Sequence, residues 1–181
     1  MTTQNLAGKV ALIQGGSRGI GAAIVKRLAA QGASVAFTYV SSAAKAEELQ
    51  NAVIAEGGKA LAIHADSADA EAIRSAVSAT VKAFGSLDIL VNNAGVGSSA
   101  DPRPLAEFRD EFWDLTMEVN MTAPYLLSKA ALPHMREQKW GRIITVASIN
   151  GRIVAPHAGA YVASKHGVIG LMRALAREHA A

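Results

Sequence analysis

The chain has 181 residues, of which 50% are hydrophobic, so it is long enough to bury one core and short for two full domains. The formal net charge is only +3 and the charges are spread evenly, which argues against a basic patch for nucleic acid. The lack of cysteine excludes disulfides and thiolate metal sites, while the polar segment 1–9 and the absence of a long apolar run indicate neither a signal peptide nor a membrane span. We expect a single domain over residues 1–181 in the cytoplasm, with no nucleic-acid or membrane partner.

Short apolar runs alternate with longer amphipathic stretches along the chain, which indicates strands and crossover helices. Strands are predicted at residues 10–14, 34–39, 59–64, 89–92 and 142–146. Helices are predicted at residues 20–31, 43–56, 68–84, 111–138 and 161–179. Gly32, Gly57 and Gly85 stand where the C-terminal caps of the first three helices belong.

The strand runs are almost continuously apolar, as in parallel strands that are covered on both faces. Repeated βα units with right-handed crossovers produce an α/β fold with a doubly wound, Rossmann-like parallel sheet, for which we expect the strand order 3-2-1-4-5. Ligands of such sheets bind at the carboxyl ends of the strands. The residues that follow each strand are therefore the candidate site.

The first strand is followed by a glycine-rich turn that leads directly into a helix. Gly15 permits a sharp turn, whereas Gly19 and Gly21 let the backbone come close to a pyrophosphate and to the neighbouring strand. The helix N-terminus then faces the anion, and this context makes a plain strand-to-helix turn the weaker alternative. The cofactor-binding residues predicted here are Gly15, Ser17, Arg18, Gly19, Ile20 and Gly21.

The end of the second strand indicates which dinucleotide binds. Enzymes that use NAD usually place an acid there for the ribose 2'-hydroxyl, and residues 39–42 contain no acid. The hydroxyls of Ser41 and Ser42 can donate to a 2'-phosphate, and Arg18 can pair with it. We therefore predict NADP(H) rather than NAD(H), with Tyr39, Ser41 and Ser42 at the cofactor. The alternative for Arg18 is a solvent-facing loop charge.

Polar residues also follow the third and fourth strands. Asp66 comes after the third strand, where a cap of the next helix explains it equally well. An Asn-Asn-Ala-Gly sequence ends the fourth strand, and buried amides at such a place must be hydrogen-bonded. The residues that these two strand ends add to the predicted cofactor site are Asp66, Ser67, Asn93, Ala94 and Gly95.

A tyrosine and a lysine lie four residues apart near the end of the sequence. On a helix the side chains of Tyr161 and Lys165 share one face, although such a pair alone is also typical of an exposed amphipathic helix. Ser148 follows the fifth strand 13 residues before Tyr161, at the edge of the sheet where ligands bind. The predicted catalytic residues are Asn120, Ser148, Tyr161 and Lys165.

Together these motifs resemble those of the short-chain dehydrogenase/reductases, over the chain from Lys9 to about Glu178. The first turn is similar to that family's TGxxxGxG loop, but Gln14 stands where the family usually has Thr, and its amide could take over the brace with a different reach. The run from Gly141 to Tyr161 is similar to 3-oxoacyl carrier-protein reductases and to related ketone and sugar-alcohol enzymes.

The resemblance implies hydride transfer between NADP(H) and a small-molecule carbonyl or alcohol substrate. Tyr161 would be the general acid in reduction, with Lys165 favouring its phenolate in the reverse direction and holding the nicotinamide ribose. Ser148 would orient the substrate oxygen. Asn120 would kink its helix and hold a water that relays protons toward Lys165. Asp66 would meet the adenine amino group, and Tyr161 and Lys165 therefore also count as cofactor-binding residues.

The resemblance also implies that the later strands of the fold are missing, because family members continue with a sixth strand, a loop over the nicotinamide and a seventh strand. The alternative function is therefore a non-catalytic dinucleotide-binding or oligomerising fragment. The helices at 111–138 and 161–179 pack between subunits in the family, so a homodimer or homotetramer is expected. Residues 97–101 and 151–158 are the candidates for the substrate pocket. Ser164 and His166 are interpreted as helix surface or packing, and no metal site is predicted.

Overall fold

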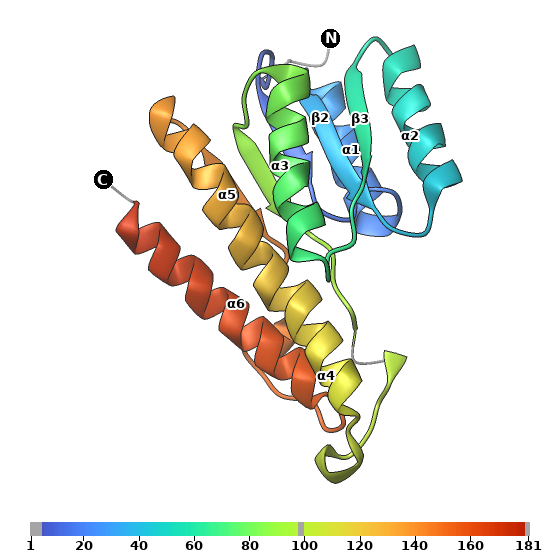
Figure 1. Cartoon of the computed structure of the whole chain (residues 1–181), viewed down its shortest axis with the longest axis vertical. Helices are drawn as coiled ribbons and strands as arrows, with labels where there is room; N and C mark the ends of the chain where they lie inside the picture. Colours follow the sequence, from blue (N-terminus) through green and yellow to red (C-terminus); the bar gives the residue numbers. More distant parts are fainter. Residues whose placement is uncertain (1–4, 98–99, 180–181) are drawn as a thin grey trace.

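The computed structural model of the protein describes residues 5–97 and 100–179. Five parallel strands form one sheet in the order β3-β2-β1-β4-β5, which confirms the predicted fold class (Figure 1). The strands are β1 (Val10–Ile13), β2 (Ser34–Tyr39), β3 (Lys59–His64), β4 (Ile89–Asn92) and β5 (Arg142–Thr145). The order reverses between β1 and β4, so the ligand-binding crevice of this sheet lies at the carboxyl ends of these two strands.

Helices connect the strands as crossovers. The α-helices are α1 (Gly19–Ala30), α2 (Ala43–Ala55), α3 (Ala70–Phe84), α4 (Asp110–Met117), α5 (Ala123–Glu137) and α6 (Gly159–Glu178). Three short helical turns are η2 (Leu105–Glu107), η3 (Glu118–Thr122) and η4 (Ile149–Gly151). None of the helices in the described ranges 5–97 and 100–179 is long and apolar enough to cross a membrane.

Side chains alternate between the two faces of the sheet, so each face has its own core. On one face Ile13 and Phe37 pack with α1 and α2 through Val25 and Leu49. On the other face Leu12 and Leu90 belong to a cluster with residues of α3 and α5. Strands β1, β2 and β4 are buried on both sides, which explains their continuous apolar runs.

The long helix predicted at residues 111–138 is interrupted. The structure has α4, then the single π-helical turn η3, then α5, and Asn120 lies inside the π turn. A π turn inserts one residue into the helical repeat, and such turns are frequent at functional sites. The chain thus changes its helical repeat at the residue for which the sequence predicted a kink.

The alternative account of Asp66, as the cap of a helix that begins at residue 68, is wrong. Helix α3 begins at Ala70, and Asp69 is its N-cap, because the Asp69 carboxylate accepts the backbone N–H groups of Glu71 and Ala72. The glycines predicted at helix ends are confirmed in the left-handed region, with φ of 92° at Gly32, 83° at Gly57 and 84° at Gly85.

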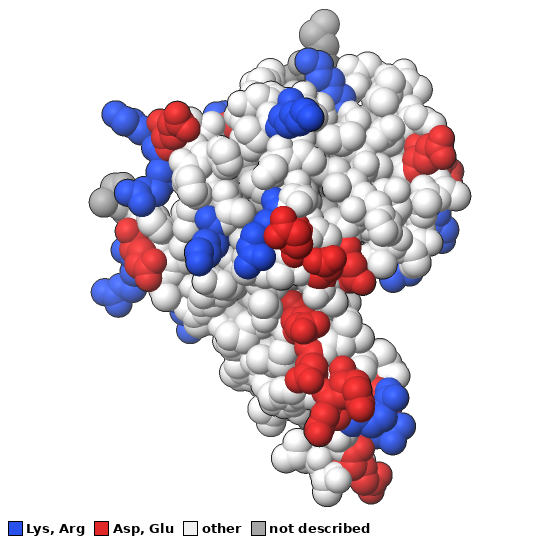
Figure 2. All heavy atoms as spheres, viewed as in Figure 1, with Lys and Arg blue, Asp and Glu red and all other residues white. Residues whose placement is uncertain are grey.

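Strand β5 lies at the edge of the sheet, and its outer side is open within the described part of the chain. Ile144 is 51% exposed there, although its neighbour in register, Val91, is buried. Figure 1 shows α5 and α6 side by side, extending beyond the sheet toward the end that carries α4. In Figure 2 acidic side chains gather over that projecting end, and Lys and Arg side chains lie mainly elsewhere.

Candidate active site

Three hydrogen bonds join the turn after β1 to neighbouring segments. Gly15 has φ of 71°, and its N–H donates to Thr38 Oγ1 over 2.9 Å. The amide Nδ2 of Asn93 donates to the carbonyl oxygens of Gln14 and Gly15, each over 3.1 Å. The turn is therefore fixed to the ends of both β2 and β4, as a rigid loop that binds an anion requires.

Two glycines of the turn stand where a side chain has no room. A Cβ atom at Gly16 would clash with Phe37, and one at Gly21 would clash with the carbonyl oxygen of Gly15. The helix can therefore start directly behind the turn. Its N-cap, Arg18, makes no side-chain capping bond, and the first turn of α1 contains no acidic residue.

This N-terminus suits a pyrophosphate. The first N–H groups of a helix carry partial positive charge and have no partner within the helix. Ser17 is half-buried, whereas Arg18, Gly19 and Ile20 are exposed, with Ile20 65% exposed. The start of α1 therefore has no side-chain cap and no acidic residue, and Arg18 lies beside it. This arrangement fits a dinucleotide phosphate.

The end of β2 offers hydroxyl groups. Ser41 is exposed, and Ser42 is the N-cap of α2 but its side chain makes no capping hydrogen bond. Tyr39 packs edge-on against His64 at a ring-centroid distance of 5.5 Å, so two aromatic rings lie together at the ends of β2 and β3. Both serine hydroxyls remain available to an external acceptor.

The residues after β3 differ in exposure. Asp66 is exposed, and one of its carboxylate oxygens accepts the N–H of Ala68 over 2.9 Å. Ser67 is buried, and its hydroxyl accepts Nε2 of Gln14 over 2.9 Å. The side chain of Ser67 thus contacts protein, and the brace expected from Gln14 exists but reaches β3.

The end of β4 supports the sheet and the turn. Nδ2 of Asn92 donates to Thr145 Oγ1 over 3.0 Å, which links β4 to β5. Asn92 Oδ1 is buried without a partner among the described residues. Ala94 lies against Gly15, because a Cβ at Gly15 would come within 3.0 Å of the Ala94 Cβ. Of the predicted residues at this strand end, Asn93 braces the turn and Ala94 packs against it.

Lys165 is the centre of the candidate catalytic group. Its side chain is 5% exposed, and Nζ donates to the carbonyl oxygen of Val146 over 2.9 Å. Burial lowers the pKa of Lys165 below 10.5, because desolvation penalises the ammonium form. Nζ also lies 5.7 Å from the centroid of the Tyr161 ring, so the structure brings the predicted pair together.

Asn120 is joined to the loop after β4 by two hydrogen bonds. Its Oδ1 accepts the N–H of Val96 over 2.8 Å, and its Nδ2 donates to the carbonyl oxygen of Val96 over 3.0 Å. Gly95 lies beside both side chains, since a Cβ there would lie 3.3 Å from Asn120 Oδ1 and 3.8 Å from Lys165 Nζ. A glycine at this position leaves open the space beside the ammonium group.

Ser164 is a member of this network that the sequence did not single out. Its side chain is fully buried, accepts Nδ2 of Asn120 over 3.1 Å and donates to the carbonyl oxygen of Tyr161 over 2.8 Å. The π turn is therefore tied to the helix that carries Tyr161 and Lys165. Of the two interpretations given for Ser164, packing is confirmed and helix surface is wrong. A small polar residue directly before Lys165 was the available signal, but it did not indicate a partner 44 residues away.

Ser148 lies on a segment that contacts Lys165 at both ends. Val146, just before it, accepts the lysine ammonium, and a Cβ at Gly151, just after it, would lie 2.9 Å from the carbonyl oxygen of Lys165. The hydroxyl of Ser148 accepts the N–H of Asn150 over 3.2 Å and is part of the wall of a hollow of about 440 Å³. Tyr161 and Ser148 are both half-buried, so both side chains are accessible to a substrate.

The structure describes only part of the two segments proposed for the substrate pocket. Residues 97, 100 and 101 and residues 151–158 are described, whereas Ser98 and Ser99 lie outside the described residues. Asp101 is buried and holds Arg103 and Arg109 through bonds of 2.7 and 2.8 Å, which lower the pKa of its carboxyl group. The two ion pairs of Asp101 therefore hold this loop in place.

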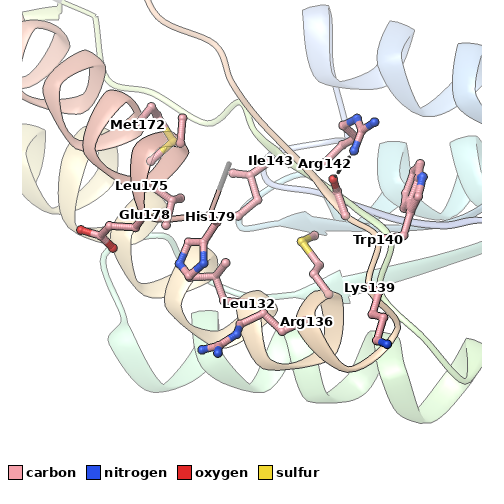
Figure 3. Close-up of a pocket in the computed structure, with 13 residues that line it drawn as sticks. Leu132, Arg136, Lys139, Trp140, Arg142, Ile143, Met172, Leu175, Glu178 and His179 are labelled. Atoms are coloured by element: carbon pink, nitrogen blue, oxygen red, sulfur yellow. Dashed lines mark hydrogen bonds between the residues drawn. The ribbon is translucent and has the colours of Figure 1, made fainter. Parts of the chain in front are cut away.

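A separate hollow lies away from this site. It has a volume of about 860 Å³ and lies between the C-terminal halves of α5 and α6 and the start of β5 (Figure 3). Leu132, Ile143 and Leu175 form part of its wall, with Arg136 and Lys139 at one side. None of the predicted catalytic residues is in its wall, so it belongs to the open edge of the sheet.

Comparisons with known proteins agree with this geometry. The family model of the short chain dehydrogenases matches residues 9–181. The 3-oxoacyl-(acyl-carrier-protein) reductase of Staphylococcus aureus is 39% identical over 170 residues, which are 94% of this chain and 68% of that protein. The chain thus spans about two thirds of the length of this relative.

Two solved structures extend the comparison. A short-chain dehydrogenase/reductase from Serratia marcescens is 48% identical with a TM-score of 0.90, over 97% of this chain and 70% of that one. A short chain dehydrogenase from Burkholderia cenocepacia in complex with NADP is 45% identical with a TM-score of 0.88, over 96% of this chain and 69% of that one. The chain therefore belongs to the short-chain dehydrogenases, a family of oxidoreductases that bind a nicotinamide dinucleotide.

Proposed function

We propose that this protein transfers a hydride between NADP(H) and a carbonyl or secondary alcohol substrate. The observation that carries the proposal is the buried ammonium group of Lys165, 5.7 Å from the Tyr161 ring and beside the π turn of Asn120. A buried cation next to a phenol at the ligand-binding edge of a doubly wound sheet is a costly arrangement, and such groups are typical of catalytic sites.

The cofactor would lie along the carboxyl ends of the strands. The uncapped start of α1, with Gly19 and Gly21, suits the pyrophosphate. The free hydroxyls of Ser41 and Ser42 and the guanidinium of Arg18 suit a 2'-phosphate, since no carboxylate at the end of β2 repels it. These groups favour NADP(H) over NAD(H), and the NADP complex of the Burkholderia relative agrees with that choice.

The protein groups would perform the proton transfer. When bound, the reduced cofactor supplies the hydride. Ser148 would donate a hydrogen bond to the substrate oxygen and thereby orient it. Tyr161 would protonate that oxygen during reduction and accept the proton during oxidation. The half-buried positions of both side chains keep them accessible to a substrate while limiting bulk water.

Lys165 and Asn120 would assist the proton transfer by Tyr161. The ammonium of Lys165 lies beside the Tyr161 ring, and its bond to the carbonyl oxygen of Val146 fixes its position. Both N–H groups of the Asn120 side chain are taken, by Val96 and Ser164. A water that relays protons toward Lys165 must therefore donate to the remaining lone pair of Asn120 Oδ1 or to a backbone carbonyl of the π turn.

The relatives indicate which substrates to test first. The Staphylococcus relative is a 3-oxoacyl-(acyl-carrier-protein) reductase, so a 3-oxoacyl thioester is the first substrate to test. Simple ketones and secondary alcohols are the next. We also propose that residues 1–181 form one domain, and that the long helices α5 and α6 pair with those of a second copy in a homo-oligomer.

One observation favours the alternative function. The open outer side of β5 and the hollow between α5 and α6 leave apolar surface uncovered in the described part of the chain. An exposed strand edge favours pairing with another segment over independent function. The alternative is that the protein binds a dinucleotide or pairs with a partner without catalysing turnover.

The test combines binding with turnover. Fluorescence titration with NADPH and NADH compares the two cofactors, and NADPH oxidation is followed with 3-oxoacyl thioesters and a panel of ketones. The proposal expects tighter binding of NADPH together with turnover of at least one substrate. Equal or tighter binding of NADH would overturn the choice of cofactor. NADPH binding without turnover of any substrate would favour the alternative.

A further inference from the structure

A buried hydrogen bond links the turn after β1 to Ser67, which lies three positions beyond the end of β3. Nε2 of Gln14 donates to Oγ of Ser67 over 2.9 Å across a sequence separation of 53 residues. Gln14 is fully buried and Ser67 is 9% exposed. Because water has little access to either group, the bond is not in competition with solvent.

The backbone of Gln14 is fixed independently of this bond. Its N–H donates to the carbonyl oxygen of Val91 over 2.9 Å, and its carbonyl oxygen accepts Nδ2 of Asn93. The side chain thus starts from a position set by β4 and reaches past β2 to the end of β3. It therefore determines where the segment of Asp66 and Ser67 lies relative to the phosphate-binding turn.

This segment lies on the side of the crevice that receives the adenosine half of a dinucleotide. In a doubly wound sheet the pyrophosphate lies at the first βα turn and the adenosine ribose at the end of β2, so the end of β3 lies beyond the ribose. Asp66 is exposed there, next to the buried Ser67. A shift of Ser67 would move Asp66 with it.

The amide is not explained by stability. Oε1 of Gln14 is buried without a hydrogen-bond partner among the described residues, and such an acceptor costs about 1–3 kcal/mol. An apolar side chain of similar length at this position would avoid that cost. The stability of the fold alone therefore favours an apolar residue, and the placement of the β3 end favours Gln.

We infer that Gln14 and Ser67 are a positioning pair that sets the affinity for the adenosine half of the cofactor. The inference rests on the proposed function, because it assumes that a dinucleotide occupies this crevice. The pair acts through the placement of Asp66 and does not contact the reacting atoms. Its loss therefore changes cofactor binding and leaves the nicotinamide half unaffected.

The test uses Gln14→Met, Ser67→Ala and the double variant. Dissociation constants are measured for NADPH, for adenosine 2',5'-bisphosphate and for reduced nicotinamide mononucleotide. Each single substitution should weaken NADPH and the bisphosphate by about 3- to 10-fold, the effect of one buried hydrogen bond. The double variant should be no weaker than the singles, the mononucleotide should be unaffected, and the melting temperature of the double variant should not fall.

Gln50→Met is the matched control. It removes another glutamine hydrogen bond to β3, in which Oε1 of Gln50 accepts the N–H of Ala62 over 2.7 Å, on the side of α2. Its dissociation constants should equal those of the wild type. Unchanged affinity in folded Gln14→Met or Ser67→Ala, or additive losses in the double variant, would overturn the inference alone. Failure of the wild type to bind NADPH would overturn the proposed function, and the inference with it.

Discussion

Substitution of Ser164 by alanine tests the network that joins the π turn to the catalytic helix. The change removes two buried hydrogen bonds, of 3.1 Å from Asn120 and 2.8 Å to the carbonyl oxygen of Tyr161. A typical buried bond contributes about 1 kcal/mol, and an orphaned buried donor costs about 1–3 kcal/mol. Since Asn120 Nδ2 keeps its bond to Val96, we expect a loss of about 2 kcal/mol in the free energy of unfolding.

Chemical denaturation and calorimetry measure this loss, which corresponds to a fall of roughly 4–8 °C in melting temperature for a domain of this size. Turnover should also fall by about tenfold or more, because the π turn is no longer fixed against Tyr161. Thr80→Val is the matched control. The Thr80 hydroxyl is equally buried and donates over 2.7 Å to Ala76 in α3, but its removal leaves no donor unpaired. Wild-type stability in Ser164→Ala, or the same small loss as in Thr80→Val, would refute the reasoning.

Three further predictions follow from the site and from the loop beside it. Tyr161→Phe should reduce turnover by about 10²- to 10⁴-fold while the dissociation constant for NADPH stays within about twofold; near-normal turnover would remove Tyr161 from its role as acid. Burial lowers the pKa of Lys165, so the unfolded state binds more protons than the folded state between that lowered pKa and 10.5. The stability of the wild type relative to Lys165→Met should therefore rise as the pH rises through this interval. A pH-independent difference in denaturation experiments would contradict this prediction. The pKa of Asp101 is lowered by Arg103 and Arg109, so the advantage of the wild type over Asp101→Asn should be present at neutral pH and shrink as the pH falls through the lowered pKa, as thermal melts from pH 7 to pH 3 can show.

The parts of the fold that sequence could predict depend on local patterns. Continuous apolar runs located β2, β3 and β4 to the residue, and the glycine spacing located the phosphate turn. The strand order followed from right-handed crossovers, which do not depend on individual side chains. Gly16 and Gly21 are required by contacts with Phe37 and Gly15, but their spacing before a helix was enough to find the turn.

The parts that sequence could not predict depend on contacts between distant residues. The π turn is set by the bonds from Asn120 to Val96 and to Ser164, which lie 24 and 44 residues away. Local propensity predicts one helix over residues 111–138, and only the family resemblance indicated a kink at Asn120. Asp66 and Asp69 are both acceptable caps by residue type, and only the start of α3 distinguishes them.

The most direct test of the central claim is whether a hydride passes from the cofactor to a carbonyl carbon under control of Tyr161. NADPH carrying deuterium at either face of the nicotinamide C4 is incubated with the protein and a 3-oxoacyl thioester, and the product is examined by mass spectrometry. We predict one deuterium on the carbinol carbon from one of the two labelled cofactors with the wild type, and transfer that is at least about 10²-fold slower with Tyr161→Phe. Tight binding of NADPH without deuterium transfer from either cofactor to that thioester or to any ketone of the panel would contradict the account.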